Sequence, residues 1–260
     1  MPYVSITFPV EGCKEIPILP IYFFKHFAYN TSKRIYEEKV MLRDIDLNKI
    51  SDGKLYGLND MARTDCNGCK GCSSCCQNMG SSIILDPLDV HRLTCGLGKT
   101  FEELLDVSLE LNVVDGITLP NLKMTGSEAM CTFLSDGRCS IHAIRPGFCR
   151  IFPLGRFYEN RSFRYFLQIH ECPAPGKSKV KIRKWIDTPD VRRYEQYITD
   201  WHYYLKDLQE YAMDFSHEDN IHKLNMYVLQ QFYLRPFDES KDFYQEFYER
   251  LAVGNLQAIL

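Results

Sequence analysis

The sequence lacks the features that would place it in several large classes of protein. Residues 1–5 carry neither the positive charge nor the apolar stretch of a secretory signal, and no run reaches the roughly 18 apolar residues of a membrane span. The formal net charge of -3 provides no basic surplus for general binding to nucleic acid or to an anionic membrane. A nucleotide-binding glycine loop, internal repeats and low-complexity tracts are also missing. We therefore expect a cytoplasmic protein with no nucleic-acid or membrane partner.

Cysteine, in contrast, is abundant, with 11 residues in a chain of 260. A reducing compartment disfavours disulfides, and a chain of this length with 45% hydrophobic residues does not need them to fold. An odd total also fits poorly with complete pairing. Five of the cysteines lie within residues 66–76. Metal ligation is the interpretation that remains.

The rest of the pattern predicts a helix-rich α+β protein. Its centre is an irregular cysteine-bearing loop with a short-strand metal-binding core, followed by a helical C-terminal region packed on it. We divide the chain into an N-terminal strand and helix segment (1–60), a cysteine-cluster metal-binding domain (61–184) and the helical region (185–260). Aromatic residues spaced along a predicted helix after Pro189 indicate a buried face rather than a substrate site.

Individual residues predict where the helices and strands begin and end. Asp86-Pro87 predicts a helix start, with Gly96 as its end, and Thr100 with Glu103 predicts a second start through a capping box. Residues 135–138, SDGR, predict a tight turn that brings Cys131 and Cys139 close together. The expected strands are Val4–Val10, Ser81–Leu85, Ile117–Leu119, Cys131–Leu134, Cys139–His142, Arg164–His170 and Val180–Arg183. The expected further helices begin near Pro20 and Thr188, and cover about His217–Leu234 and Glu239–Ala258.

The dense cysteine segment, residues 66–76, reads CNGCKGCSSCC. Two-residue spacings let consecutive thiolates converge on one metal or cluster and free backbone N–H groups to bond the sulfurs. The segment resembles the start of a bacterial ferredoxin motif, but no Cys-Pro follows at the expected distance, which argues against a ferredoxin. Four later cysteines lie at or beside predicted strand ends and turns, and we include them as candidate ligands: Cys131, Cys139, Cys149 and Cys172.

These residues occur in a recognisable order: CxxCxxCC at Cys69–Cys76, Cys131-Thr-Phe-Leu, Cys139-Ser-Ile-His142, RPGFCRIFP at residues 145–153, and His170-Glu-Cys172-Pro. The order resembles the CxxCxxCC cysteine-cluster family, also called YkgJ-type zinc- or iron-chelating proteins, over roughly Cys66–Cys172. The resemblance implies a metal site built from eight cysteines, with Cys66 as an addition. The same cysteine domain occurs in flagellin lysine N-methylases, which by resemblance implies a [4Fe-4S] cluster. The candidate metal ligands are Cys66, Cys69, Cys72, Cys75, Cys76, Cys131, Cys139, Cys149 and Cys172.

Other residues near these cysteines receive more modest roles. We expect His142 and His170 to bond ligand sulfurs rather than bind metal, because thiolates already suffice in number. Arginines should offset thiolate charge or pair with acids in the fold: Arg145, Arg150 and Arg156. Cys13, His26 and Cys95 belong to no ligand pattern and are interpreted as packing residues.

The leading functional hypothesis is a protein that holds one or more [4Fe-4S]-type iron–sulfur centres, since a closely spaced cysteine set on a loop suits clusters. Structural zinc uses the same residues and remains the close alternative. The resemblance also keeps open an enzyme that modifies a protein or peptide substrate, as a lysine N-methylase does. Metal delivery is the third alternative, and the residues do not decide whether the protein is catalytic.

The vicinal pair Cys75-Cys76 raises the question of one metal site or two. Adjacent side chains leave the backbone in different directions, so both thiolates rarely reach one ion without strain. Eight cysteines could divide into two sets of four, each combining part of the Cys69–Cys76 loop with part of the later group. The sequence does not assign the halves.

Overall fold

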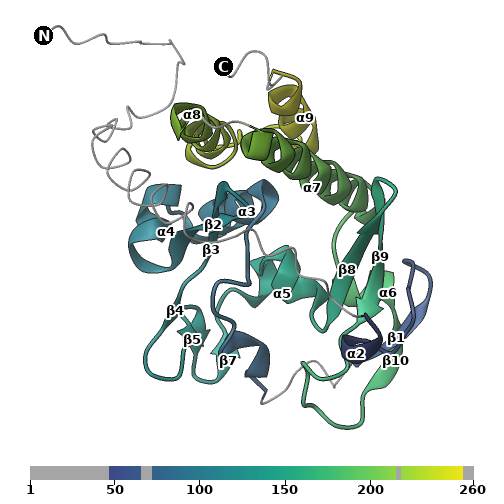
Figure 1. The fold of residues 1–260 in the computed structure, drawn as a ribbon. Coiled ribbons are helices and arrows are strands. Elements are labelled where there is room, and N and C mark those ends of the chain that lie inside the picture. The colour runs from purple at the N-terminus through teal and green to yellow at the C-terminus, as the bar shows by residue number, and fades with distance from the viewer. Residues whose placement is uncertain (1–46, 66–71, 215–217, 254–260) are drawn as a thin grey trace, which may run out of the picture.

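The computed structural model describes residues 47–65, 72–214 and 218–253 (Figure 1). The strand expected at Val4–Val10 and the helix near Pro20 lie outside these residues, as do Cys13 and His26. Two of the candidate ligands, Cys66 and Cys69, also lie outside them. The other seven candidate ligands are described.

Helices and short strands are mixed, and the α+β prediction is confirmed. The helices are α2 (Leu47–Ile50), α3 (Pro87–Leu97), α4 (Phe101–Val107), α5 (Gly147–Ile151), α6 (Ile182–Ile186), α7 (Val191–Asp214), α8 (Glu218–Leu229) and α9 (Phe243–Val253), with the 3₁₀ turns η1 (Ser74–Cys76) and η2 (His142–Ile144) and the π-helical turn η3 (Gln230–Leu234). The strands are β1 (Met61–Asp65), β2 (Leu109–Val114), β3 (Ile117–Leu122), β4 (Met124–Thr125), β5 (Met130–Cys131), β6 (Leu134–Ser135), β7 (Arg138–Cys139), β8 (Leu154–Glu159), β9 (Ser162–Leu167) and β10 (Ser178–Lys181).

Throughout the described part of the chain the strands form two-stranded antiparallel pairs and no wider sheet. The pairs are β1–β10, β2–β3, β4–β5, β6–β7 and β8–β9. The β6–β7 hairpin confirms the predicted turn, since Leu134 pairs with Cys139 across it. Asp136 and Gly137 both have positive φ at its tip, the geometry of a two-residue hairpin turn. Isolated two-stranded hairpins are marginally stable, so these elements depend on what packs between them.

The capping predictions for α3 and α4 are correct at their starts. Asp86 accepts a hydrogen bond from Asp89 N–H, with Pro87 in the first turn, and Thr100 with Glu103 forms a second capping box. The predicted end of α3 at Gly96 is wrong. The helix runs through Leu97, and Gly98 is the C-cap with a φ of 62° that suits glycine.

Two further local expectations differ from the structure. The segment Ser81–Leu85 forms an isolated bridge, Ile84 to Asn121, rather than a strand. The segment around Cys149 forms the short helix α5, which the turn-rich sequence around it did not predict. Pro146 stands directly before this helix, a position that fits its fixed φ and its missing N–H.

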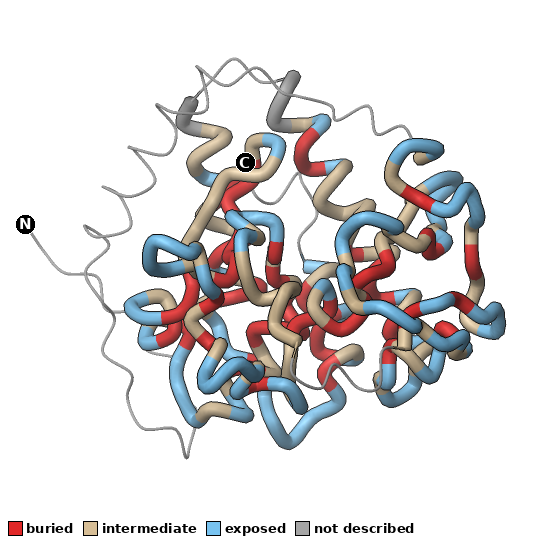
Figure 2. Tube along the Cα trace, turned by 90° about the horizontal axis from the view of Figure 1, so that it is seen from below, coloured by how far each residue is buried: buried red, intermediate tan, exposed pale blue. Residues whose placement is uncertain are grey.

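The C-terminal helices lie together over one side of the hairpin region (Figure 1). The predicted aromatic face of α7 is buried at Tyr194, Tyr197 and Trp201, which confirms that it is part of the core. Buried positions gather in the interior, and the connecting loops at the rim are exposed (Figure 2). Within the described ranges no helix combines the length and the apolar character required to cross a membrane.

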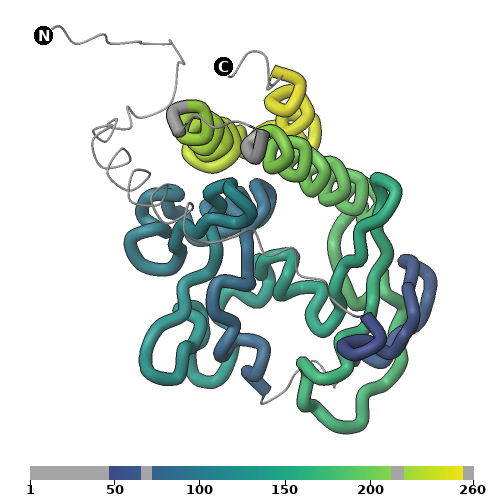
Figure 3. The backbone as a smooth tube through the Cα atoms, viewed as in Figure 1, coloured from purple at the N-terminus to yellow at the C-terminus, as the bar shows by residue number. Residues whose placement is uncertain are grey.

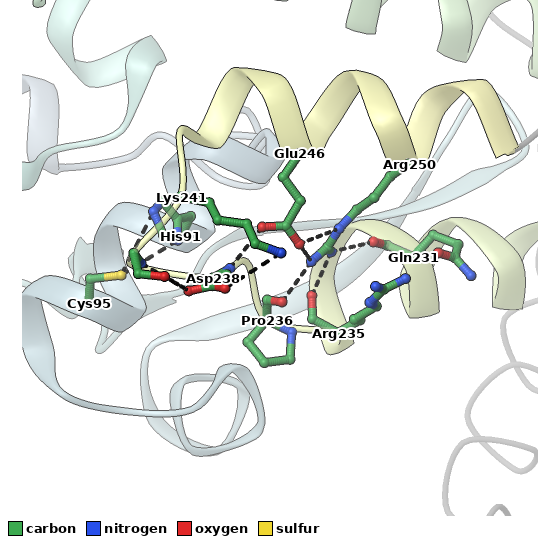
Figure 4. Close-up of polar contacts among 10 residues, drawn as sticks. His91, Cys95, Gln231, Arg235, Pro236, Asp238, Lys241, Glu246 and Arg250 are labelled. Atoms are coloured by element: carbon green, nitrogen blue, oxygen red, sulfur yellow. Dashed lines mark hydrogen bonds and ion pairs between the residues drawn. The ribbon is translucent and has the colours of Figure 1, made fainter. Parts of the chain in front are cut away.

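A buried ion pair fixes α9 against the turn that precedes it. Arg250 forms an ion pair with Glu246, 2.5 Å apart, and both side chains are almost fully buried. The same guanidinium donates to backbone carbonyls of Gln231, Arg235 and Pro236 (Figure 4). These carbonyls at the end of η3 have no helical partners, so one cation satisfies several of them.

Asn225 connects α8 to the β2–β3 hairpin. Its amide oxygen accepts from the backbone N–H of Thr118, and its Nδ2 donates to the carbonyl of Gly116 at 3.1 Å. The side chain is 5% exposed, so water cannot replace these bonds easily. The helical region is thereby attached to the hairpin region by side-chain bonds as well as by apolar packing.

We predict that Asn225→Ala lowers the free energy of unfolding by about 1–3 kcal/mol, because it leaves a buried backbone N–H without a partner. The measurement is denaturant unfolding followed by circular dichroism. Gln196→Ala is the matched control, since Gln196 bonds Asp200 on the exposed face of α7. Equal stability losses in the two variants would contradict the structural role of Asn225.

Candidate metal centre

The described cysteines are free thiols, and most of them face one cavity. This large cavity has a volume of about 60 Å³. The cysteines that line it are Cys72, Cys75, Cys76, Cys131, Cys139 and Cys149. Six of the seven described candidate ligands therefore share one hollow, although they are spread over nearly eighty residues of sequence.

Each wall of the large cavity comes from a different element. The turn η1 carries Cys75 and Cys76, the end of β5 carries Cys131, the end of β7 carries Cys139, and α5 carries Cys149. The segment that includes η1 runs between the β4–β7 hairpins and the β1–β10 pair (Figure 3). The predicted proximity of Cys131 and Cys139 is confirmed, because the two thiols share this cavity and interact electrostatically.

A small cavity of about 20 Å³ lies beside the same segment. Cys172 lines it together with Cys72 and Cys75, which line both cavities. Thr64 of β1 and Trp185 of α6 contribute to its wall. Of the seven described candidate ligands, Cys172 is thus the one that lines the small cavity and not the large one.

Three thiols in the large cavity contact one another. Hydrogen bonds from the Cys76 thiol lower the pKa of Cys75 to about 7 and that of Cys139 to about 6. The same contacts raise the pKa of Cys76, which keeps its proton to share it with both neighbours. Arg145 favours the charged form of Cys75 and Cys139. Thiolates, which are the form that binds metal, are therefore accessible near neutral pH.

Two other thiols of the large cavity, Cys131 and Cys149, have raised pKa values. Burial raises the pKa of Cys149, and the nearby Asp89 carboxylate raises it further. Burial also raises the pKa of Cys131. A bound metal cation would supply the positive charge that these desolvated sites lack, since metal binding deprotonates a coordinating thiol.

Arg145 and His142 form a polar rim at this cavity. The guanidinium of Arg145 lies 2.9 Å from Nε2 of His142, and both residues line the large cavity. This nitrogen of His142 is thus occupied by Arg145, and the expected hydrogen bond from His142 to a ligand sulfur stays a prediction. His170 is exposed and lines neither cavity.

The other two predicted arginines act within the fold. Arg150 is buried and donates to the carbonyls of Asp187 and Ala143. Arg156 is half-buried among aromatic rings and donates to the hydroxyl of Tyr194 at 2.9 Å. Neither lines a cavity, so of the three arginines only Arg145 is placed to offset thiolate charge.

Cys95 lies apart from both cavities, as its isolation in the sequence suggested. Its Sγ is 3.5 Å from Nδ1 of His91 on the same helix, α3 (Figure 4). The expectation that it is a packing residue is wrong, however, because its side chain is exposed. Cys95 is therefore a natural control thiol for experiments on the other cysteines.

The donor chemistry fits a metal, although the thiols are not gathered around one point. Among the residues that the structure describes, no three Cys, His, Asp or Glu side chains are already arranged to hold one ion. Several thiols with accessible thiolate forms in one shared hollow nevertheless provide a soft ligand set of the kind that selects zinc and iron–sulfur centres.

Two residues at these cavities have no counterpart in the predicted site. Arg138 lines the large cavity beside Cys139, and Thr64 lines the small one. The sequence could have predicted the place of Arg138 at the site, because Arg138 directly precedes the candidate ligand Cys139. Thr64 carries none, because β1 reaches the small cavity through its pairing with β10, more than 100 residues later.

Residues 68–173 match the family model CxxCxxCC, described as "Putative zinc- or iron-chelating domain". The match confirms the resemblance to this family and supports metal binding by the cysteine domain. It covers all seven described candidate ligands. No curated protein and no solved structure matches the chain.

In metal-free protein we predict that Cys139 is alkylated faster than Cys131 or Cys149 at neutral pH. Its pKa of about 6 leaves it mostly as thiolate above that pH, and the raised pKa values of the other two keep them protonated. Mass spectrometry after iodoacetamide treatment across a pH series measures this order.

Arg145→Gln should move the alkylation midpoint of Cys139 to higher pH, because it removes a cation that favours the thiolate. Arg161→Gln is the control, since Arg161 pairs with Asp207 at an exposed position. An unchanged midpoint in Arg145→Gln would exclude Arg145 as a source of thiolate stabilisation.

Proposed function

We propose that this protein binds an iron–sulfur cluster of the [4Fe-4S] type in its large cavity. The premise is that residues 68–173 match the CxxCxxCC zinc- or iron-chelating domain. The observation that supports the proposal is that six cysteines line one hollow, five of them from four elements and Cys72 from the segment before η1. All-cysteine ligation is typical of iron–sulfur clusters. The proposed ligands are drawn from the predicted set, Cys66, Cys69, Cys72, Cys75, Cys76, Cys131, Cys139, Cys149 and Cys172.

The surroundings of the cavity support a centre that carries net negative charge. Arg145 and Arg138 line its wall, and Arg145 already favours the thiolate forms of Cys75 and Cys139. Cationic and hydrogen-bonding neighbours stabilise thiolate-ligated clusters and tune their reduction potential. A bound cluster would supply electron transfer or Lewis acidity, and the residues of this chain would hold it and limit its contact with water.

Structural zinc is the second candidate, favoured by the family description itself. Four thiolates around a tetrahedral ion would connect η1 to the hairpins and α5 in the same way. Both candidates agree with the proposal of a cytoplasmic location, because a reducing compartment keeps thiols free for metal. Metal ions are the proposed partners in either case.

We predict that anaerobically purified protein contains iron and acid-labile sulfide and shows the visible and EPR spectra of a cluster. Cys139→Ser should lose at least about half of this content, because Cys139 lines the large cavity and contacts a second thiol. Cys95→Ser, the matched control at an exposed position on α3, should retain all of it. Colourless protein with stoichiometric zinc and no sulfide would replace the iron–sulfur assignment by the zinc one.

Removal of the metal should also lower the melting temperature, by about 5 °C or more, because binding energy available only to the folded state contributes to stability. The hairpins around the cavity bury little apolar surface of their own, so the middle of the chain should lose the most protection in hydrogen exchange. Differential scanning fluorimetry of loaded and chelated protein measures the first effect. Identical melting curves would show that the fold does not depend on the metal.

A further inference from the structure

The segment that contains Cys72, Cys75 and Cys76 contributes to both cavities. Cys76 lines only the large one, whereas Cys72 and Cys75 line both. The thiols of Cys75 and Cys76 hydrogen-bond each other in the short 3₁₀ turn η1, and of the two only Cys75 also lines the small cavity. The vicinal pair therefore lies at the boundary between the two cavities.

The large cavity contains enough ligands for a complete centre without the shared residues. Four cysteines line it and not the small cavity: Cys76, Cys131, Cys139 and Cys149. Four thiolates complete a tetrahedral zinc site and equally the ligand set of a [4Fe-4S] cluster. Cys72, Cys75 and Cys172 are thus left over from this centre.

The small cavity collects those three remaining thiols. Cys172 reaches it from the loop before β10. A single centre in the large cavity would leave Cys172 without a role, although it lies within the residues that match the family model. Three cysteines that line one second hollow are candidates for a second ligand set.

Thr64 provides an independent observation at the small cavity. The residue is 0% exposed, and its Oγ1 has no hydrogen-bond partner among the described residues. An unpaired buried hydroxyl costs about 1–3 kcal/mol, so such groups are rare in folded proteins. A metal-bound sulfur in the small cavity would accept a hydrogen bond from this hydroxyl. Such hydrogen bonds stabilise the ligand sulfurs of metal centres. The neighbouring Trp185 is not available for this, because its N–H donates to the carbonyls of Ile151 and Phe152.

We propose that the cysteine domain holds two separate metal centres, one on each side of η1. Cys76, Cys131, Cys139 and Cys149 bind the first in the large cavity, and Cys72, Cys75 and Cys172 bind the second in the small cavity, with Thr64 bonded to one of its sulfurs. The proposal rests on the proposed function, since it assumes that the domain binds zinc or iron–sulfur centres. It assigns the two members of the vicinal pair to different centres.

The test compares Cys76→Ser with Cys172→Ser, each purified anaerobically, with Cys95→Ser as the control. Iron, sulfide and zinc per chain are measured together with EPR spectra. Each of the first two variants should lose about half of the metal and a different part of the spectrum, because each set serves its own centre. A variant pair that loses the same single signal completely, or Cys172→Ser with full metal content, would overturn the proposal.

A second measurement on the wild-type protein covers the case in which a variant does not fold. Loaded protein is treated with a chelator in the presence of an alkylating reagent, and labelling of each cysteine peptide is followed by mass spectrometry. Labelling of Cys172 should follow one time course, and labelling of Cys131 and Cys149 another, at least several-fold different in rate. One common time course for all of them indicates one centre and refutes the proposal.

Failure of the proposed function gives a different result, so the two hypotheses can be separated. Wild-type protein without bound iron or zinc would refute metal binding altogether. Wild-type protein with one equivalent of centre, removed by either substitution, would keep the proposed function and exclude the second site. Thr64→Val should shift the spectrum of the Cys172-dependent centre and leave the other unchanged.

Discussion

Two buried carboxylates hold together the elements that position the cysteines. Asp86 caps α3 and accepts a hydrogen bond from the hydroxyl of Tyr197 on α7 at 3.0 Å. Asp89 accepts a hydrogen bond from the backbone N–H of Gly147 at 2.8 Å. Gly147 begins α5, the helix that carries Cys149. Burial raises the pKa of both acids, so their hydrogen bonds must offset a large desolvation cost. The helical scaffold and the cysteine site thus meet at this pair.

The hairpins around the site depend on that scaffold. Each is a two-stranded unit, and β4–β5 and β6–β7 have strands of two residues each. Such short strands cannot maintain a hydrophobic face of their own, so their cysteines depend on the common core, which includes Cys131 and against which Cys139 packs. A metal centre between them would act as the small core that the hairpins lack, which explains why a chain of 260 residues concentrates its cysteines here.

The charge distribution follows the same division. Arg150 is buried and Arg156 half-buried in the scaffold, where they donate to carbonyl and hydroxyl groups, whereas Arg145 lines the cavity with the thiols. Three arginines close in sequence therefore have distinct surroundings. The cation that matters to the thiols is the one whose backbone lies between η2 and α5, at the edge of the large cavity.

Much of the local structure and of the candidate ligand set followed from the sequence alone. The caps of α3 and α4, the turn at Asp136-Gly137 and the buried face of α7 depend on a few neighbouring residues, and they are correct. The end of α3 and the helix at Cys149 were missed, because Gly96 is tolerated where α3 packs closely against Ile144, and a five-residue helix has too little periodicity to detect. The grouping of cysteines into two cavities and the unpaired hydroxyl of Thr64 were decided only by the tertiary structure. They arise from contacts such as β1 with β10, between segments more than 100 residues apart, which local spacing does not encode.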